Sequence, residues 1–410
     1  MKPVTVLMIL LLLGALRPAW AQNAAAPIRV QADASAKVVA QDGRAARALR
    51  TLLRRIVLPP GFRIELYAMV PNARQMAISP DGKVVFVGTR RGQVWAVADR
   101  DRDGTADAVT QFAPAIRFDK PNGVAVAGDG TLFVAERNRV LMFPDAAAFR
   151  RGTDFLAIPI VPQGTLIPPV EESRNHSARV IEIGPGGRLY ISLGQPYNVS
   201  PPEKLALYER TGIGGIIRMN RDGSGREVHT RGVRNSVGMD FHPETGELWF
   251  TDNQVDLMGD DIPPGEINRQ TAPGQHFGFP WYGGGSVRTH EYADQPLPKG
   301  MVLPASETVA HAADLGMSFY TGDMFPARYR NAIFSAQHGS WNRTQPIGAR
   351  VMVSFVDMSG RATTRPFAEG WLNADGGYDG RPVDVLQMPD GALLVSDDFA
   401  GALYRISYAP

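Results

Sequence analysis

Six short apolar strands, each preceded by a turn, recur along this chain. The turns are rich in proline, glycine and aspartate, and the apolar runs alternate with a period of two residues, as half-buried antiparallel strands do. The copies are Pro80-Asp81-Gly82 before VVFVGT, Gly128-Asp129-Gly130 before TLFVAE, Gly184-Pro185-Gly186-Gly187 before RLYISLG, Pro243-Glu244-Thr245-Gly246 before ELWFTDN, a degenerate turn from Pro326 to Asn331 before AIFSAQ, and Pro389-Asp390-Gly391 before ALLVSDD. Six matched turns over more than 300 residues favour an all-β, six-bladed β-propeller with four strands in each blade over a β-sandwich.

The N-terminal residues divide into two segments ahead of the expected propeller. Residues 1–21 carry one lysine, an apolar run from Val4 to Leu16 and the sequence Ala19-Trp20-Ala21, which predict a signal peptide and a periplasmic or secreted protein. The apolar run is shorter than the ~20 residues of a membrane span, so stable membrane insertion is not expected. Residues 22–57 form a partly helical extension, and the propeller is expected over 58–410.

Within that extension, residues 43–57 are basic and amphipathic. They fit a helix packed on the propeller, or a contact with a membrane surface or a partner.

Composition excludes several classes of function. The chain has 43 lysine and arginine residues against 41 aspartate and glutamate residues, and the arginines are dispersed, so no nucleic-acid footprint is expected. It has 0 cysteines, which excludes disulfides and a CxxCH haem attachment. With 44% hydrophobic residues among 410, one large domain can bury its core without a partner subunit.

Polar residues stand just ahead of each expected innermost strand, where the loops of a propeller meet around the axis. They are Gln75, Asn122, His176, Arg234 with Asn235, Asp314 and Arg381. The two arginines suit an anionic, oxygen-rich ligand, because a guanidinium stays charged and offers a fixed fork of donors. A histidine beside such cations is expected to stay neutral and to be available as a base. Gln75 and Asn122, taken alone, also fit strand-capping contacts.

Two acidic loops are candidate metal sites. The segment Asn253 to Asn268 holds Asp256, Asp260, Asp261 and Glu266 directly after a strand, and fits either a Ca²⁺ site or a solvated loop. The segment Asp99 to Asp107 spaces carboxylates as a calcium loop does but lacks a glutamate at the twelfth position. A charged turn is the favoured interpretation there.

Two aromatic segments leave their role open. His338-Gly339-Ser340-Trp341-Asn342-Arg343 fits either a stacking wall for a planar ligand or a tryptophan packed between blades. The segment Gly274 to Gly285 fits either a substrate-side loop or packing between blades.

At these residues the chain resembles the pyrroloquinoline quinone (PQQ)-dependent sugar dehydrogenases, the soluble glucose and sorbosone dehydrogenase family. The resemblance runs from about Leu58 to Tyr408 and is carried by ARQMAISPDG, KPNGVAV, RNHSARVIEIGPGGRLYISLG, RGVRNSVGMDFHPETGELWFTDN, GDDIPPGEIN, FGFPW, FYTGDMFP, AQHGSWNRT and GRPVDVLQMPDGALLVSDD. It implies a six-bladed propeller that oxidises a sugar by hydride transfer to PQQ beside Ca²⁺.

The same resemblance implies roles for individual residues. His176 would be the general base, and Arg234 would polarise the C5 oxygen of PQQ. Asn235 would hold the ortho-quinone, and Arg381 would pair with a cofactor carboxylate. Arg343, Gln75 and Asn122 are further candidates for cofactor contacts because of their positions in the segments described above. Metal ligands would come from the carbonyls of Gln254 and Val255, and the acidic loop described above offers Asp260 and Asp261 as further candidate ligands.

The chain departs from the family pattern at two places. It has Asn253-Gln254-Val255-Asp256 where sorbosone-type members have Asn-Gly-Arg-Asp, in the loop whose carbonyls would bind calcium. Around His176 it has Asn-His-Ser-Ala-Arg in place of His-His-Gly-Trp-Lys, so a substrate-shaping histidine and an aromatic residue are missing.

Two other classes of function remain open. A calcium-dependent lactonase or esterase propeller would need several carboxylate or amide ligands around one axial metal, and the axial arginines disfavour that arrangement. A non-catalytic sugar-binding propeller is disfavoured by His176, Arg234, Asn235 and Arg381 occurring together. An enzyme without a haem motif would pass its electrons to an external cytochrome or quinone.

Overall fold

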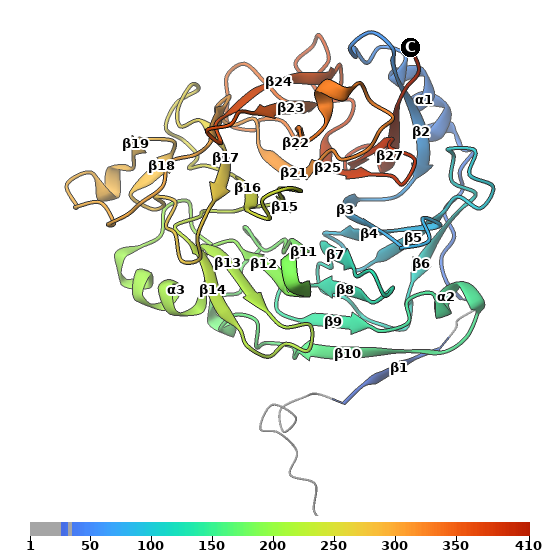
Figure 1. The fold of residues 1–410 in the computed structure, drawn as a ribbon, viewed down its shortest axis with the longest axis horizontal. Coiled ribbons are helices and arrows are strands. Elements are labelled where there is room, and N and C mark those ends of the chain that lie inside the picture. The colour runs from blue at the N-terminus through green and yellow to red at the C-terminus, as the bar shows by residue number, and fades with distance from the viewer. Residues whose placement is uncertain (1–25, 32–34) are drawn as a thin grey trace, which may run out of the picture.

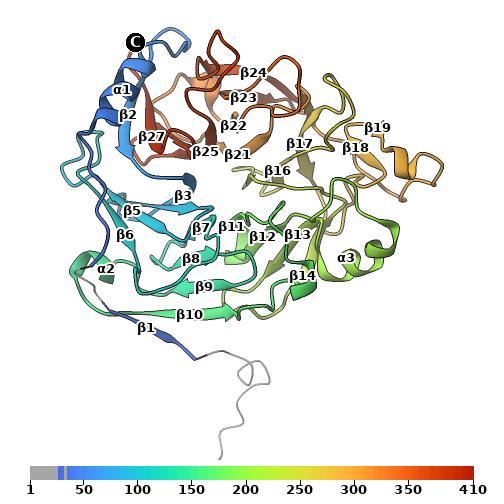
Figure 2. The same ribbon diagram turned by 180° about the vertical axis from the view of Figure 1, so that it is seen from behind.

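The computed structural model describes residues 26–31 and 35–410, and it confirms the six-bladed β-propeller. Six antiparallel sheets stand around a common centre, as Figure 1 shows from one side and Figure 2 from the other. The predicted signal peptide, residues 1–21, lies outside the described residues.

Each blade holds four strands, counted from the axis outward. Blades 1 and 2 are β3 (Ala73–Ile78), β4 (Val84–Thr89), β5 (Val94–Ala98) and β6 (Ala108–Phe112), then β7 (Gly123–Val126), β8 (Leu132–Ala135), β9 (Val140–Phe143) and β10 (Phe155–Val161). Blades 3 and 4 are β11 (Ile181–Ile183), β12 (Leu189–Leu193), β13 (Gly215–Met219) and β14 (Glu227–Arg231), then β15 (Met239–Phe241), β16 (Leu248–Asp252), β17 (Gly265–Gln270) and β20 (Ser306–Thr308). Blades 5 and 6 are β21 (Asp314–Phe319), β22 (Ile333–Gln337), β23 (Arg350–Val356) and β24 (Ala362–Glu369), then β25 (Pro382–Gln387), β26 (Leu393–Asp397), β27 (Ala402–Tyr408) and β2 (Phe62–Met69).

The remaining elements lie outside these blades. Strand β1 (Ile28–Val30) extends blade 2 beyond β10, and β18 (Tyr282–Gly284) pairs with β19 (Val287–Arg288) as a separate hairpin. The described α-helices are α1 (Arg44–Leu53), α2 (Ala148–Arg151) and α3 (Leu205–Thr211).

The six recurring turns connect the first and second strands of the blades. At each turn at least one residue has a positive φ, which glycine adopts without strain and asparagine tolerates better than other residues. These residues are Gly82, Gly130, Gly186, Gly246, Asn331 and Gly391. The degenerate fifth turn therefore keeps the backbone conformation of the others and uses asparagine in place of glycine.

The second strands differ from the prediction of half-buried strands. Every residue of β4, β8, β12, β16, β22 and β26 is buried. The reason is that each blade packs face to face against its two neighbours, so both faces of its inner strands lie in apolar surroundings.

The ring is closed by pairing the two ends of the propeller. Strand β2 pairs with β27 in antiparallel register from Phe62 opposite Tyr408 to Met69 opposite Ala402, so blade 6 combines N-terminal and C-terminal strands. Helix α1 packs on this closure through buried Ala46, Leu49 and Leu52. The interpretation of residues 43–57 as a helix packed on the propeller is thus confirmed.

None of the helices in residues 26–31 and 35–410 has the length and apolar character of a membrane span.

Candidate axial site

A cavity of about 490 Å³ opens at one end of the propeller axis. Loops from blades 1, 3, 4 and 5 line it, because they precede an innermost strand or follow a second strand. Its polar lining includes Arg74, Arg90, His176, Asn198, Arg234, Asn235, Asn253, Asp256 and His338, and its rim includes Tyr197 and Trp341. Three of the predicted ring residues, His176, Arg234 and Asn235, therefore share one cavity.

His176 is held in an unusual backbone conformation with one ring nitrogen occupied. Its φ is 47°, a value that non-glycine residues adopt rarely. Its Nδ1 lies 2.6 Å from the carbonyl oxygen of Gln195. Since a carbonyl only accepts hydrogen bonds, Nδ1 must carry the proton, which leaves a lone pair on Nε2. No described residue binds Nε2, so this nitrogen is free to accept a proton.

The environment keeps this imidazole neutral. Burial, and then the positive charge of Arg234, lower the pKa of His176 to about 4. The expectation of a neutral base beside cations agrees with this geometry.

Arg234 is fixed by acceptors on both neighbouring loops. Its Nε donates to the carbonyl of Asn198 (2.9 Å), and its Nη1 donates to the carbonyl of Asn253 (3.1 Å). Its Nη2 donates to Asn198 Oδ1 and to Asp256 Oδ2, each at 2.8 Å. A guanidinium has five N–H donors, so one hydrogen on Nη1 remains for a ligand.

Asp252 positions the main chain of both axial residues of blade 4. Its two carboxylate oxygens accept from the amides of Arg234 (2.8 Å) and Asn235 (2.7 Å). In blade 6, Asp397 occupies the same place at the end of the second strand and accepts from the amide of Arg381 (2.9 Å). In both blades, the aspartate at the end of the second strand thus binds the loop before the innermost strand through main-chain amide hydrogen bonds.

Asn235 has an unpaired side-chain atom. Its Oδ1 is buried and has no hydrogen-bond partner among the described residues. Buried polar atoms are almost always paired, so an orphaned amide at a cavity wall indicates a missing ligand group.

Four other predicted ring residues do not line the cavity. Gln75 lies inside β3, where its amide binds the main chain of Ile181 and Val124 across the channel. Asn122 accepts from Arg74 and donates to the carbonyl of Arg179. Both make the strand-capping contacts that were the alternative for them.

Asp314 and Arg381 also make local contacts. Asp314 is fully buried at the start of β21 and accepts from Gln337 (2.9 Å). Arg381 donates to the carbonyls of His338 (2.9 Å) and Gly339 (2.7 Å), so it lies behind the cavity wall. Only three of the seven predicted ring residues therefore line the cavity, because the other four are committed to hydrogen bonds with neighbouring strands and loops.

The four predicted metal ligands are divided between two places. Asp260 binds the main-chain amide and the hydroxyl of Thr344, and Asp261 pairs with Arg343 (3.2 Å). Gln254 turns its side-chain amide back to the carbonyl of Asp252. The structure thus separates the two aspartates from Gln254 and Val255, and it places Arg343 against the aspartates and outside the axial cavity lining.

The main-chain carbonyl groups of Gln254 and Val255 are available as ligands. Val255 donates its amide to Gly283 (2.9 Å), but no described residue donates a hydrogen bond to the carbonyl of Gln254 or Val255.

Among the described residues, one group of three carboxylates approaches closely enough to share an ion, and it lies on an outer hairpin. This group is Asp99, Asp101 and Asp107. It belongs to the peripheral loop and not to the axis.

Arg74, Asp252 and Asp398 are among the axial residues that sequence reasoning missed. Arg74 lies beside the predicted Gln75, and its guanidinium pairs with Asp398 at 2.6 Å. His338 Nε2 lies 2.8 Å from the same carboxyl group. Asp398 directly follows β26, the second strand of blade 6. The FTDN and VSDD endings of two second strands were the signal that could have found Asp252 and Asp398.

The exposure of Trp341 decides whether the tryptophan of the segment His338 to Arg343 is packed between blades. Its side chain is 68% exposed and lines the cavity rim, so it is not packed between blades.

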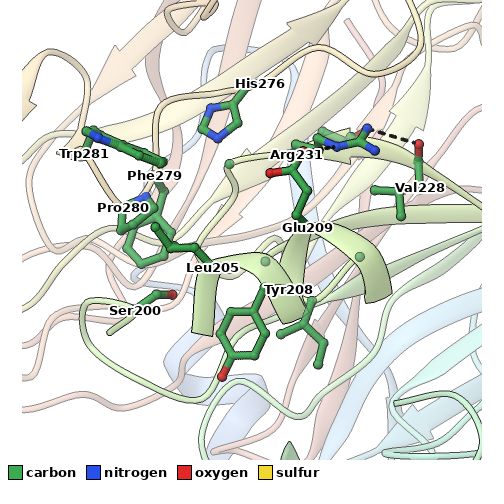
Figure 3. Close-up of a pocket in the computed structure, with 15 residues that line it drawn as sticks. Ser200, Leu205, Tyr208, Glu209, Val228, Arg231, His276, Phe279, Pro280 and Trp281 are labelled. Carbon is green, nitrogen blue, oxygen red and sulfur yellow. Dashed lines mark hydrogen bonds and ion pairs between the residues drawn. The ribbon is translucent and has the colours of Figure 1, made fainter. Parts of the chain in front are cut away.

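A second, smaller cavity lies away from the axis, between helix α3 and the segment 276–281 (Figure 3). Its volume is about 50 Å³, and His276, Trp281, Glu209 and Arg231 lie around it. This is room for a few waters and far below the ~300 Å³ of a typical ligand pocket. The aromatic segment Gly274 to Gly285 thus contributes to this outer cavity and packing, and not to the axial site.

Comparisons with known proteins agree with this architecture. An uncharacterized protein of Borreliella burgdorferi is 38% identical over 245 residues, and an aldose sugar dehydrogenase of Escherichia coli is 27% identical over 262 residues. Each match covers 58% of this chain and 62% of the relative. The PQQ domain of a pyranose dehydrogenase from Coprinopsis cinerea, solved in its holo form, shares the fold with a TM-score of 0.68 at 19% identity, over 86% of this chain and 97% of that one.

The sequence model of one family, described as glucose/sorbosone dehydrogenase, matches residues 166–405. This segment is more than half of the 410 residues and contains His176, Arg234 and Asn235. By this match, the chain belongs to the glucose/sorbosone dehydrogenase family.

Proposed function

We propose that this chain is a PQQ-dependent sugar dehydrogenase that works in the periplasm or outside the cell. Its substrate would be an aldose, a sorbosone-like aldehyde or a related polyol, and its electrons would pass to an external cytochrome or quinone. The observation that carries the proposal is the axial imidazole of His176, whose Nδ1 is committed to Gln195 and whose Nε2 is free beside Arg234.

The residues of the cavity fit an ortho-quinone cofactor. One N–H of Arg234 is left to donate to a carbonyl oxygen of the cofactor, and the unpaired Oδ1 of Asn235 is left to accept a hydrogen bond from an N–H or O–H group of a ligand. The free carbonyls of Gln254 and Val255 are hard oxygen ligands of the kind that Ca²⁺ prefers. When bound, PQQ supplies the hydride acceptor and Ca²⁺ supplies Lewis-acid polarisation.

Each residue then has a definite task. His176 takes the proton of the sugar hydroxyl on Nε2, and its Nδ1–H bond to the carbonyl of Gln195 stabilises the imidazolium that results. Arg234 donates a hydrogen bond through its remaining N–H to the oxygen on which negative charge develops. Its guanidinium is held in place by Asn198 and Asp256. Because both groups are fixed before substrate arrives, little reorganisation is needed during the reaction.

Addition of PQQ with Ca²⁺ to the purified apoprotein tests the proposal. We expect a stoichiometric absorbance change, followed by dye reduction with some members of a panel of aldoses, sugar alcohols and aldehydes. The same titration without Ca²⁺ is the control for the metal. Absence of a PQQ-dependent absorbance change would overturn the proposal.

The pH dependence of the reaction follows from the lowered pKa of His176. Because this pKa is about 4, the imidazole stays neutral as pH falls from 8 to about 5, and it is protonated only at lower pH. We expect log kcat/KM to stay flat over that range and to fall below it. An NMR titration of His176 in the apoprotein checks the pKa directly, and an acid limb with a midpoint near the ordinary 6.5 would contradict the assignment.

A further inference from the structure

A second axial cavity of about 530 Å³ adjoins the first, on the side of blades 1 and 2. We call it the basic annex. Six cationic side chains line it, and Asp398 is the one carboxylate among the residues that form its lining. The cations are Arg74, Arg90, Arg91, Lys120, Arg137 and Arg174.

Most of this positive charge is not neutralised by the protein. Arg74 pairs with Asp398 (2.6 Å), and Arg137 pairs with Asp119 (2.7 Å). Arg90 and Arg174 are exposed and make no side-chain hydrogen bond or ion pair with another described residue. The annex therefore presents unpaired cationic donors to an anion that enters it.

The hydrogen bonds and the pKa of Lys120 also indicate an excess of positive charge in the basic annex. Its Nζ donates only to neutral acceptors, the carbonyl of Arg174 (3.1 Å) and the hydroxyl of Ser177 (2.7 Å). Burial, and then Arg137 and Arg90, lower the pKa of Lys120 to about 8. An anion in the annex would relieve this repulsion and raise that pKa.

The annex is continuous with the base. Arg74 and Arg90 line both cavities. The two groups that Lys120 binds, on Arg174 and Ser177, flank His176 in the chain. Beneath them, the buried guanidinium of Arg179 binds the carbonyls of both Arg137 (3.0 Å) and His176 (3.2 Å).

The position of the annex separates it from the proposed cofactor groups. Arg234, Asn235 and the loop of Gln254 belong to blade 4, whereas the annex belongs mainly to blades 1 and 2. Both cavities fall in the ~300 to 1,000 Å³ range of ligand pockets, so there is room for two ligands. All annex cations except Arg174 precede residue 166, where the match to the family begins.

We propose that the basic annex binds the anionic group of the substrate, which makes this chain a dehydrogenase for sugars that carry a carboxylate or a phosphate. The inference rests on the proposed function for the oxidation itself. The anionic end would lie among Arg174, Arg137 and Lys120, and the hydroxyl to be oxidised would lie at Nε2 of His176. Arginine forks bind both carboxylate and phosphate groups in two-point contacts.

Calorimetric titration of the apoprotein with glucuronate, glucose 6-phosphate and glucose tests the annex without any catalytic readout. We expect the two anionic sugars to bind at least about tenfold more tightly than glucose, with a strong dependence on salt. Arg174→Gln should weaken the anionic sugars by about tenfold, the loss of one charge-assisted contact, and leave glucose unchanged. Arg91→Gln provides a second variant with little structural risk, since its side chain is exposed.

Arg63→Gln is the matched control, because Arg63 is an exposed arginine on β2, the outermost strand of blade 6. PQQ affinity is measured on the same proteins. Equal binding of glucose and the anionic sugars would overturn the inference, and so would an Arg174→Gln variant that loses PQQ as strongly as it loses anionic sugars, since the annex would then serve the cofactor. If the wild-type protein binds glucose 6-phosphate through Arg174 but does not bind PQQ, the anion site stands and the dehydrogenase proposal fails.

Discussion

Replacing His176 by asparagine is expected to lower kcat by about 10²- to 10⁴-fold, the usual contribution of a general base. Asparagine is the suitable substitution because it tolerates the positive φ of 47° at this position, so the loop should keep its shape. PQQ affinity should stay close to that of the wild type, because the proposed cofactor contacts come from Arg234 and Asn235. Single-turnover kinetics with PQQ loaded beforehand would measure the chemical step separately from binding.

His229→Gln is the control for this experiment. His229 is also buried, and its pKa is likewise lowered to about 4, but it lies on β14 against Tyr190 and outside the axial cavity. A lowered pKa is common to both histidines, so the pKa alone does not mark a catalytic base. Full turnover of His176→Asn, or an equal loss in both variants, would remove His176 from the mechanism.

The fold could be predicted because its signal is local and repeated. A turn that needs one residue with positive φ marks the first connection of every blade, and five of the six copies supply glycine there. The fifth copy is recognised only by its spacing, since Asn331 adopts the positive φ in place of a glycine. What the pattern could not show is that β4 and its equivalents are buried on both faces, because that depends on neighbouring blades.

The candidate site could be predicted only in part, for a related reason. Position ahead of an innermost strand predicts a place at the cavity, and this is true of His176 and Arg234. Gln75 is already inside its strand, and the strand's alternation turns its amide toward Ile181. A shift of one residue along a strand reverses the side to which a side chain points. Arg74, the neighbour of Gln75, is accordingly the residue that lines the cavity.

The basic annex lies beyond what spacing can reveal. Its cations come from three blades and are separated by as many as 100 residues between Arg74 and Arg174, with a net charge of only +2 for the whole chain. Balanced composition excluded an extended basic surface, but it left room for a local excess of charge. Closure of the ring produces that excess, because it brings loops of different blades around one axis.

Replacing Phe62 by alanine is expected to lower the free energy of unfolding by about 3 to 5 kcal/mol, the cost of removing a buried aromatic side chain. Phe62 begins β2. The centroid of its ring lies 4.8 Å from the ring centroid of Phe325 and 4.9 Å from those of Phe367 and Tyr408. These contacts join the closing strand to blades 5 and 6. Denaturant unfolding measures the change, and Phe399→Ala, which removes a ring that is 62% exposed, should cost far less. Phe62 lies on the strand that closes the ring by pairing with β27. A loss below about 1 kcal/mol would show that contacts other than this aromatic cluster hold the ends of the propeller together.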